Sequence, residues 1–430
     1  MFVFARPAPG LTEPPAPDAS ELERLVAKAL EENPEVRSAR AAAEAAAARV
    51  LPAGALPDPM FSIDYENDGG SFSLGEEPMT RLSFMAQQAI PFPGKLRLAG
   101  EIAAKDAERT RTVPDRVALT LAASVKRAYA DLVEAREDQR LVDEQVGTWK
   151  WIEEVIRARY AAGMGSQQDV LRAQSEGTRL LQQRARDVAA ERIALARLRE
   201  LLFLPLDAPI PTTLRLVPGT VPAPPPAEEE ALARALDVTP ELKEAALAKE
   251  RAGLSVDLAR RDLKPDFVVS AGYMNRGSLP LMWAAGVGVS VPLWAGAKQR
   301  PLIAAARSEA EAAVANEESL RRAIEGLTQQ RLVRLEQLVE EARLDAGGVL
   351  VQDRLSVESA LASYRSGAVP FVTVLEALST DFVDRRAAVS RLADLIRARA
   401  DLEEYALTGS ASSAMAPSAP RAGAAAGSKM

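Results

Sequence analysis

One stretch of the chain occurs twice, and each copy interrupts a long helical pattern. The copies span residues 157–173 and 361–377, so matching positions lie 204 residues apart. Gly163 and Gly367 stand at the same place in both, each three residues after a Tyr and ahead of a renewed apolar pattern. Glycine adopts the positive φ that ends a helix and lets the chain turn back. Each copy therefore predicts the tip of a helical hairpin, at about 163–166 and 367–370.

The repetition extends well beyond the tips. Three further pairs of segments recur in the same order, namely 27–36 with 233–242, 56–65 with 264–273, and 89–97 with 290–300. Recurrence of several elements in fixed order is the sequence signature of an internal duplication. The interpretation is a Pro-rich N-terminal segment over 1–19, a first repeat over 20–202, a Pro-rich connector over 203–226, a second repeat over 227–407, and a disordered tail over 408–430.

Each repeat predicts two strands followed by a long helical hairpin. Apolar and polar residues alternate over about 59–66, 80–90, 266–275 and 282–292, as expected of strands. The hairpins follow over about 94–202 and 297–407, with Pro114 as the only strong break in the first long helix. The steps of four and three that define a heptad seam run along this helix through the following residues: Leu121, Val125, Ala128, Leu132, Ala135, Val142, Val146, Trp149, Ile156 and Tyr160.

Composition excludes several classes of function. The 430 residues carry a net charge of −7, which disfavours nucleic acid as a partner. The chain contains no Cys and no His, so disulfides, thiolate or imidazole metal sites and triads using either residue are excluded. Neither a catalytic constellation nor a cofactor motif is evident, so we expect no enzyme, cofactor or bound metal. The first ten residues resemble the end of an export signal, which suggests a processed or truncated start.

The predicted strands have the length of tilted membrane-spanning strands, and no apolar run is long enough for a membrane-spanning helix. One chain supplies four strands, too few to close a barrel, and an open sheet edge is not stable in lipid. Several chains would therefore share one barrel. Two chains would give eight strands and a filled interior, whereas three would give twelve and leave a passage.

At this point the chain resembles the TolC family of outer-membrane efflux proteins, nearest to its heavy-metal and multidrug branches. The resemblance rests on the paired tips, on the strand-ending segments 91–95 and 291–296, and on the helix joins 33–35 and 239–241. It implies a homotrimer with a twelve-stranded barrel in outer-membrane lipid and a long α-helical tunnel across the periplasm. It also implies a passive exit duct that docks to a periplasmic adaptor protein and an inner-membrane pump of the RND or ABC type.

The resemblance also implies which tip residues form a gate. Tyr364 matches the gate tyrosine of the family, Asp169 its aspartate partner, and Glu376 one position of an acidic ring. Two positions depart from the family pattern, because Thr373 stands where a second ring acid often occurs and Val369 where an arginine often occurs. Packing beneath the turn and solvated helix charge remain the alternative interpretations of these residues.

The candidate tip residues are therefore Tyr160, Gly163, Asp169, Tyr364, Gly367 and Glu376. The leading hypothesis is an exit duct for small molecules or metal ions. A duct for type I protein secretion is the alternative within the same fold. A soluble coiled-coil scaffold would explain the helices but not the repeated alternating segments.

Overall fold

A computed structural model describes residues 17–67, 69–70, 72 and 79–405. The disordered tail expected over 408–430 and most of the Pro-rich start lie outside the described residues, as do parts of the loop before residue 79. The first repeat contains α1 (Pro17–Glu32), α2 (Pro34–Ala48), α3 (Val50–Ala53), β1 (Met60–Glu66), β2 (Arg81–Ile90), α4 (Lys95–Ala161) and α5 (Gln167–Leu201). The second contains α6 (Glu228–Val238), α7 (Pro240–Arg261), β3 (Asp266–Asn275), β4 (Met282–Ser290), α8 (Gln299–Leu344), η1 (Asp345–Val349), α9 (Leu350–Arg365) and α10 (Phe371–Glu404).

The first hairpin consists of α4 and α5. Helix α4 runs for 67 residues and keeps Pro114 inside it, so this proline does not end the helix. Helix α5 begins after Ser166, whose hydroxyl accepts a hydrogen bond from the Asp169 N–H at 3.2 Å. Such an N-cap satisfies one of the backbone donors that the first turn of a helix leaves free.

The second hairpin differs from the prediction in one respect. The sequence predicts a single helix from about 297 to 366, and that prediction is wrong, because the π turn η1 separates α8 from α9. In this turn the Leu350 N–H donates to the Asp345 carbonyl, five residues earlier. Periodicity alone does not reveal such a turn, since the apolar pattern continues on both sides of it.

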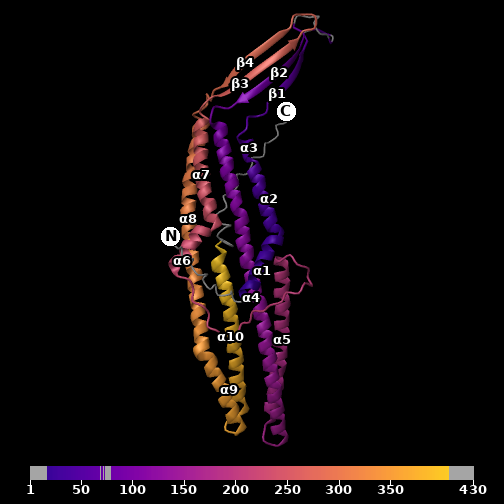
Figure 1. Ribbon diagram of the computed structural model, residues 1–430, viewed down its shortest axis with the longest axis vertical. Helices are drawn as coiled ribbons and strands as arrows, with labels where there is room; N and C mark the ends of the chain where they lie inside the picture. Colours follow the sequence, from indigo (N-terminus) through magenta and orange to yellow (C-terminus); the bar gives the residue numbers. More distant parts are fainter. Residues whose placement is uncertain (1–16, 68, 71, 73–78, 406–430) are drawn as a thin grey trace, which may run out of the picture. The chain divides into compact units, whose positions relative to one another are not determined.

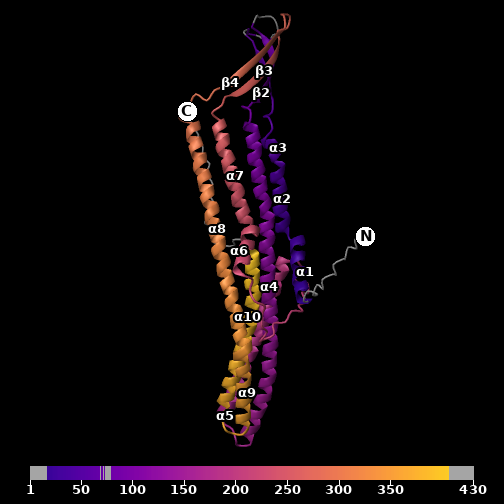
Figure 2. The same ribbon diagram turned by 60° about the vertical axis from the view of Figure 1, so that its left-hand side comes forward.

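The four strands form one antiparallel sheet in the order β1-β2-β3-β4 (Figures 1 and 2). The strand pairs of the two repeats are joined through β2 and β3, where Phe84 lies opposite Tyr273. The two outer strands, β1 and β4, each pair with one neighbour only. None of the described helices is long and apolar enough to cross a membrane.

The chain divides into two compact units, and each unit contains segments of both repeats. The first comprises 1–36, 117–238 and 324–430, and the second comprises 37–116 and 239–323, with the sheet. The core of the first unit is built on the predicted seam, where Val125, Leu132 and Val142 are fully buried. The core continues through α5, α8 and α10, so the hairpins of both repeats pack together.

Candidate functional site

Both hairpin tips end in the same backbone motif. Gly163 has a φ of 72° and Gly367 a φ of 79°, as the repeated sequence predicts. The Met164 N–H donates to the Arg159 carbonyl at 2.9 Å, and the Ala368 N–H donates to the Ser363 carbonyl at the same distance. These six-residue closures, with the glycine in the left-handed region, are Schellman motifs, which satisfy the last carbonyls of each helix.

The two tips contact each other through arginine and aromatic side chains. The Arg159 guanidinium donates to the Tyr364 carbonyl at 2.9 Å, and its carbon lies 4.5 Å from the centre of the Tyr364 ring. In the opposite direction, the Arg365 guanidinium lies 5.5 Å from the ring centre of Trp151. Cation–π contacts of this kind stabilise exposed pairs modestly. The contacts connect the first hairpin to the second at the level of the tips.

A second core lies directly beneath the tips. It contains Trp149 and Ile156 of α4 and Phe371 of α10, all almost completely buried. The Trp149 indole N–H donates to the Ala173 carbonyl of α5 at 2.7 Å. Gly177 faces the same indole, and a Cβ there would lie 3.4 Å from Trp149 Cδ1. The tryptophan therefore holds α4 against α5 through both packing and a buried hydrogen bond.

The candidate tyrosines lie in different environments although their positions match in sequence. Tyr160 keeps 47% of its surface exposed, so the prediction that it closes the buried seam is wrong. Helix α4 ends one residue after Tyr160, at Ala161. Tyr364 is half-buried against Phe371, with ring centres 6.0 Å apart. Burial raises the pKa of the Tyr364 phenol, the Arg159 charge opposes this and the Asp169 charge adds to it.

The two carboxylates of the proposed gate differ in exposure, because Asp169 is half-buried and Glu376 is exposed. Asp169 lies in the first turn of α5, near enough to Tyr364 to influence its pKa. Glu376 lies on the exposed face of α10, two turns from the second tip. The structure thus brings Asp169 close enough to Tyr364 for their charges to interact. The gate roles of all six candidate residues stay predictions.

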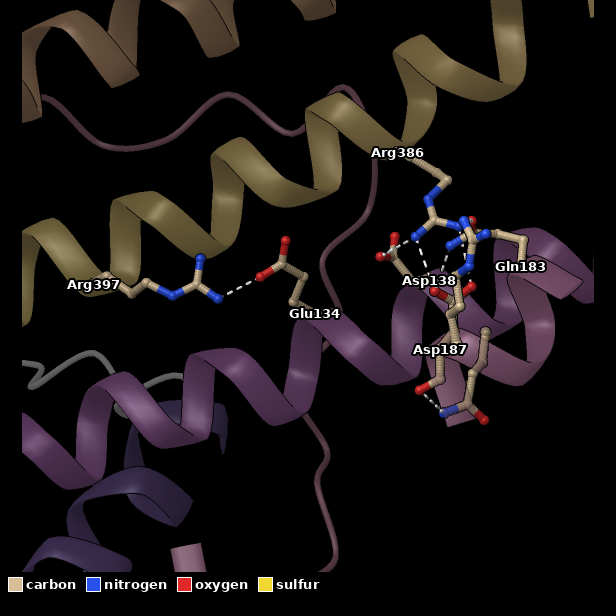
Figure 3. A network of polar contacts seen from close by, with 8 residues as sticks. Glu134, Asp138, Gln183, Asp187, Arg386 and Arg397 are labelled. Atoms are coloured by element: carbon tan, nitrogen blue, oxygen red, sulfur yellow. Dashed lines mark hydrogen bonds and ion pairs between the residues drawn. The ribbon is translucent and has the colours of Figure 1, made fainter. Parts of the chain in front are cut away.

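A polar network below this core joins three helices (Figure 3). The Arg386 guanidinium of α10 reaches Asp138 of α4 at 2.7 Å and Asp187 of α5 at 3.0 Å. Gln183 donates to the same Asp187 carboxylate at 2.9 Å, and Arg397 pairs with Glu134 further along α10. Charge-assisted hydrogen bonds of this kind are stronger and more directional than neutral ones. Arg386 therefore links both helices of the first hairpin to the second.

Among the residues of this network, Asp138 lies where its negative charge is least favourable. Burial raises the pKa of Asp138 to about 6, because desolvation outweighs the attraction of Arg386 while Asp187 and Glu134 add repulsion. Within the described chain, its Oδ1 atom is buried without a hydrogen-bond partner. Sequence reasoning missed this residue, since a charge next to the seam gives no signal in one helix alone.

Sequence comparison of the two repeats could have found another acidic site. The tip shift of 204 residues places Asp353, Asp381 and Asp384 where the first repeat has Trp149, Gly177 and Leu180. Burial raises the pKa of Asp353, and its contact with Asp384 raises it further. The second hairpin thus carries carboxylates where the first carries its tryptophan anchor. Among the described residues, no group of three or more acidic side chains has the arrangement of a metal site.

Comparison with known proteins places this fold in a family. The family model described as "Outer membrane efflux protein" matches residues 25–202 and 231–409. The chain is 26% identical over 401 residues to the pyoverdine export outer membrane protein OpmQ of Pseudomonas putida, covering 83% of this chain and 79% of OpmQ. It is 28% identical over 176 residues to protein CyaE of Bordetella pertussis, covering 39% of this chain but only 37% of CyaE.

A solved structure shares the fold over most of the length. The open state of the MtrE outer membrane channel of Neisseria gonorrhoeae superposes with a TM-score of 0.74 at 20% identity, covering 90% of this chain and 88% of MtrE. Since the family model matches both repeats almost completely, the chain belongs to the outer membrane efflux protein family. This confirms the predicted class, a duplicated transport protein of the outer membrane rather than a scaffold.

Proposed function

We propose that the chain is the exit duct of a three-part export system and works as a homotrimer. Three chains share one twelve-stranded barrel in the outer membrane, and their hairpins form a tunnel in the periplasm. The tips dock to a periplasmic adaptor protein, which connects them to an inner-membrane pump of the RND or ABC type. The cargo is a small organic molecule or a metal ion, and the similarity to OpmQ favours the former.

The two faces of the sheet carry this proposal. Residues directly opposite one another on neighbouring strands share a face. The row Ile63, Phe84, Tyr273 and Trp283 crosses all four strands and is apolar. The other large apolar members of this face are Phe61, Tyr65, Leu82, Ile90, Phe267, Val269, Val287 and Val289. Many of them are exposed, including Trp283 at 80%, as expected of a surface that contacts lipid.

The opposite face mixes small, polar and charged residues with four methionines and Val268. Its central row is Ser62, Met85, Gly272 and Ala284. The face also carries Ser83, Gln87, Ser270, Gly286, Gly288 and Ser290, with charged residues at Asp64, Glu66, Arg81 and Asp266. A Cβ on Gly272 would lie 2.0 Å from Met85 Sδ, so glycine leaves room for the methionine across the strand. Because it carries the polar and charged residues, this face suits the wall of a water-filled passage better than the aromatic face does.

The test is the mass of the purified protein in detergent, corrected for bound detergent. We expect three copies, because each sheet has two edge strands that need partners. A folded monomer would contradict the shared barrel. A tag inserted between Asn275 and Pro280 should also be labelled on intact cells, and labelling only after lysis would contradict the orientation. The matching loop at 66–78 lies partly outside the described residues.

Cargo requires a separate experiment. Deletion of the gene should sensitise cells to a class of small molecules or metal ions that the intact system exports. A neighbouring gene for an adaptor and a resistance-type pump would agree with this. Loss of one secreted protein, with unchanged sensitivity to small molecules, would instead favour the secretion alternative.

A further inference from the structure

The second repeat contains one more residue than the first between two matched points. From Lys95 to Tyr160 there are 65 steps along the chain, whereas from Lys298 to Tyr364 there are 66. Both lysines follow the segment that ends the preceding strand, and both tyrosines lie three residues before a tip glycine. The extra residue therefore lies somewhere in the ascending helix of the second hairpin.

Burial shows where the extra residue lies. Before the π turn the buried seam matches at a shift of 203, because Leu335 takes the place of Leu132 while the next residue, Glu336, is exposed. After the turn the seam matches at 204, because Ala360 takes the place of Ile156. The shift changes across η1. The π turn thus absorbs the extra residue without rotating the buried face.

The two steps across this place can be compared directly. In α4 the seam advances from Val142 to Val146 in four residues, as one α-helical turn requires. In the second repeat it advances from Asp345 to Leu350 in five, and the hydrogen bond between these two closes the wider π turn. A π turn accommodates one residue more per turn than an α-helix, with poorer hydrogen-bond geometry. Each path completes one turn and returns to the same face.

The π turn begins at a residue held by an ion pair and continues into two glycines. Asp345 is 6% exposed at the position of Val142, and its carboxylate lies 2.5 Å from the Arg391 guanidinium of α10. This partly buried ion pair holds the end of α8 against α10. Gly347 and Gly348 follow, neither has a positive φ, and a Cβ on either would meet nothing within 4 Å. Neither backbone conformation nor packing therefore requires glycine there.

We propose that the π turn Asp345–Val349 is a bending joint in the second hairpin, fixed on its α8 side by the Asp345–Arg391 pair. Sharp bends in helices occur at π turns and at glycines, where the backbone hydrogen bonds are weakest. The matching part of α4 is a regular helix. The two hairpins therefore differ in stiffness, and the second bends on the tip side of residue 345 while the first does not.

The first experiment tests the inserted residue. Deletion of Gly348 from the full chain should leave the turn as a regular helix, with both parts of the seam still facing the core. We expect wild-type amounts of oligomer and unchanged resistance of the tips to trypsin. The matched control deletes Glu144 of α4, which rotates everything beyond it by about 100°. The control should expose the tip core and lose that resistance. Equal loss of trypsin resistance in both deletion variants would contradict the proposal that the π turn absorbs an extra residue.

The second experiment tests the joint. Because the chain has no cysteine, spin labels can be placed singly on exposed residues. Labels at Arg334 and Glu358 span the π turn, and labels at Asp131 and Glu154 span the matching part of α4. Samples diluted with unlabelled chain report distances within one chain.

The wild-type distance distribution should be broader for the second hairpin than for the first. Deletion of Gly348 should narrow the distance distribution of the second hairpin to the width measured for the first hairpin. The variant G347A/G348A keeps the inserted residue, so it should narrow the same distribution without changing which residues form the seam. Equal widths in the wild-type hairpins would overturn the joint, as would a width unaffected by both changes. The comparison of the two wild-type hairpins decides the matter even if the deletion variant fails to assemble.

Discussion

At the scale of single residues, the ionisation of Asp138 makes the stability of the packed hairpins depend on pH. The fold raises the pKa of Asp138 to about 6, against 3.8 in the unperturbed group. Its favourable contribution to folding is therefore fully present at low pH and is lost as the pH rises through about 6. Asp138 shares Arg386 with Asp187, so ionisation places a second negative charge beside one already paired.

Asp138→Asn should remove this dependence, because the amide cannot ionise. Relative to wild type, the variant should gain stability between about pH 5 and about pH 8, on the order of 1 kcal/mol once partial solvent access is allowed for. Thermal unfolding in detergent at both pH values measures this. Asp143→Asn, on an exposed carboxylate of the same helix that pairs with Arg184, is the control. An identical pH dependence of stability in wild type and Asp138→Asn would show that Asp138 does not cause that dependence.

The tip glycines make a second prediction at this scale. Gly367 has a φ of 79° and no neighbour within reach of a Cβ, so a substitution there is strained by the backbone alone. Gly367→Val should cost about 1 kcal/mol or more at the turn. We expect normal oligomer formation and membrane insertion with weaker adaptor binding in a pull-down assay. Gly326→Ala, in a helix with open space around it, should bind normally. Full adaptor binding by Gly367→Val would show that docking does not depend on the conformation of this tip.

The residues of the site differ in how far sequence could predict them. The tip glycines follow from a local rule, because a chain that turns back sharply at the end of a helix needs a residue with positive φ. The Arg159–Tyr364 contact and the Arg386 network join residues about 200 positions apart. Nothing in either helix alone marks such partners. They become visible only when the hairpins lie side by side.

At the scale of helices and strands, periodicity predicts the path of the chain and fails where that path is irregular. The apolar positions of the α4 seam are buried from Leu121 to Ile156 except for the partly buried Val146, and the buried seam ends before Tyr160. The strands lie within about one or two residues of their predicted bounds. The π turn was missed because it preserves the pattern that sequence analysis measures. Only a comparison of the two repeats reveals the additional residue.

Trp149 provides the prediction at this scale. Trp149→Phe keeps the aromatic packing of the tip core but removes the hydrogen bond to the Ala173 carbonyl. The expected loss is about 1–3 kcal/mol, from the missing bond and the smaller ring. Trp151→Phe, at an exposed residue two positions away, should change stability by less than about 1 kcal/mol. Denaturant unfolding of both variants measures the difference. Equal effects would show that the buried hydrogen bond does not hold the hairpin.

At the scale of the whole molecule, the exposed carboxylate of Glu376 becomes informative only in an assembly. In one chain it lies on the solvent face of α10. Three copies around the narrow end of a duct would bring three such charges together, and they would reinforce one another's attraction for cations. The three carboxylates come together only if three chains surround the duct, so the effect cannot arise in a single chain.

Glu376→Gln should therefore reduce cation preference and weaken block by multivalent cations in single-channel recordings across a bilayer. Glu358→Gln, at an exposed position of α9, removes an equal charge and should leave both properties as in wild type. Unchanged selectivity and block in Glu376→Gln would return this residue to the interpretation of a solvated helix charge.

The outer edges of β1 and β4, which pair with no further strand of the described chain, also affect how quickly the protein enters its membrane. A lone chain carries backbone donors and acceptors along β1 and β4 that lipid cannot satisfy. Association must then precede or accompany entry into the bilayer, and the chance of forming a complete ring depends on several chains meeting. The rate of insertion should consequently rise more steeply than in proportion to the supply of newly exported chains. A cell that halves its synthesis of this protein would lose more than half of its rate of delivery.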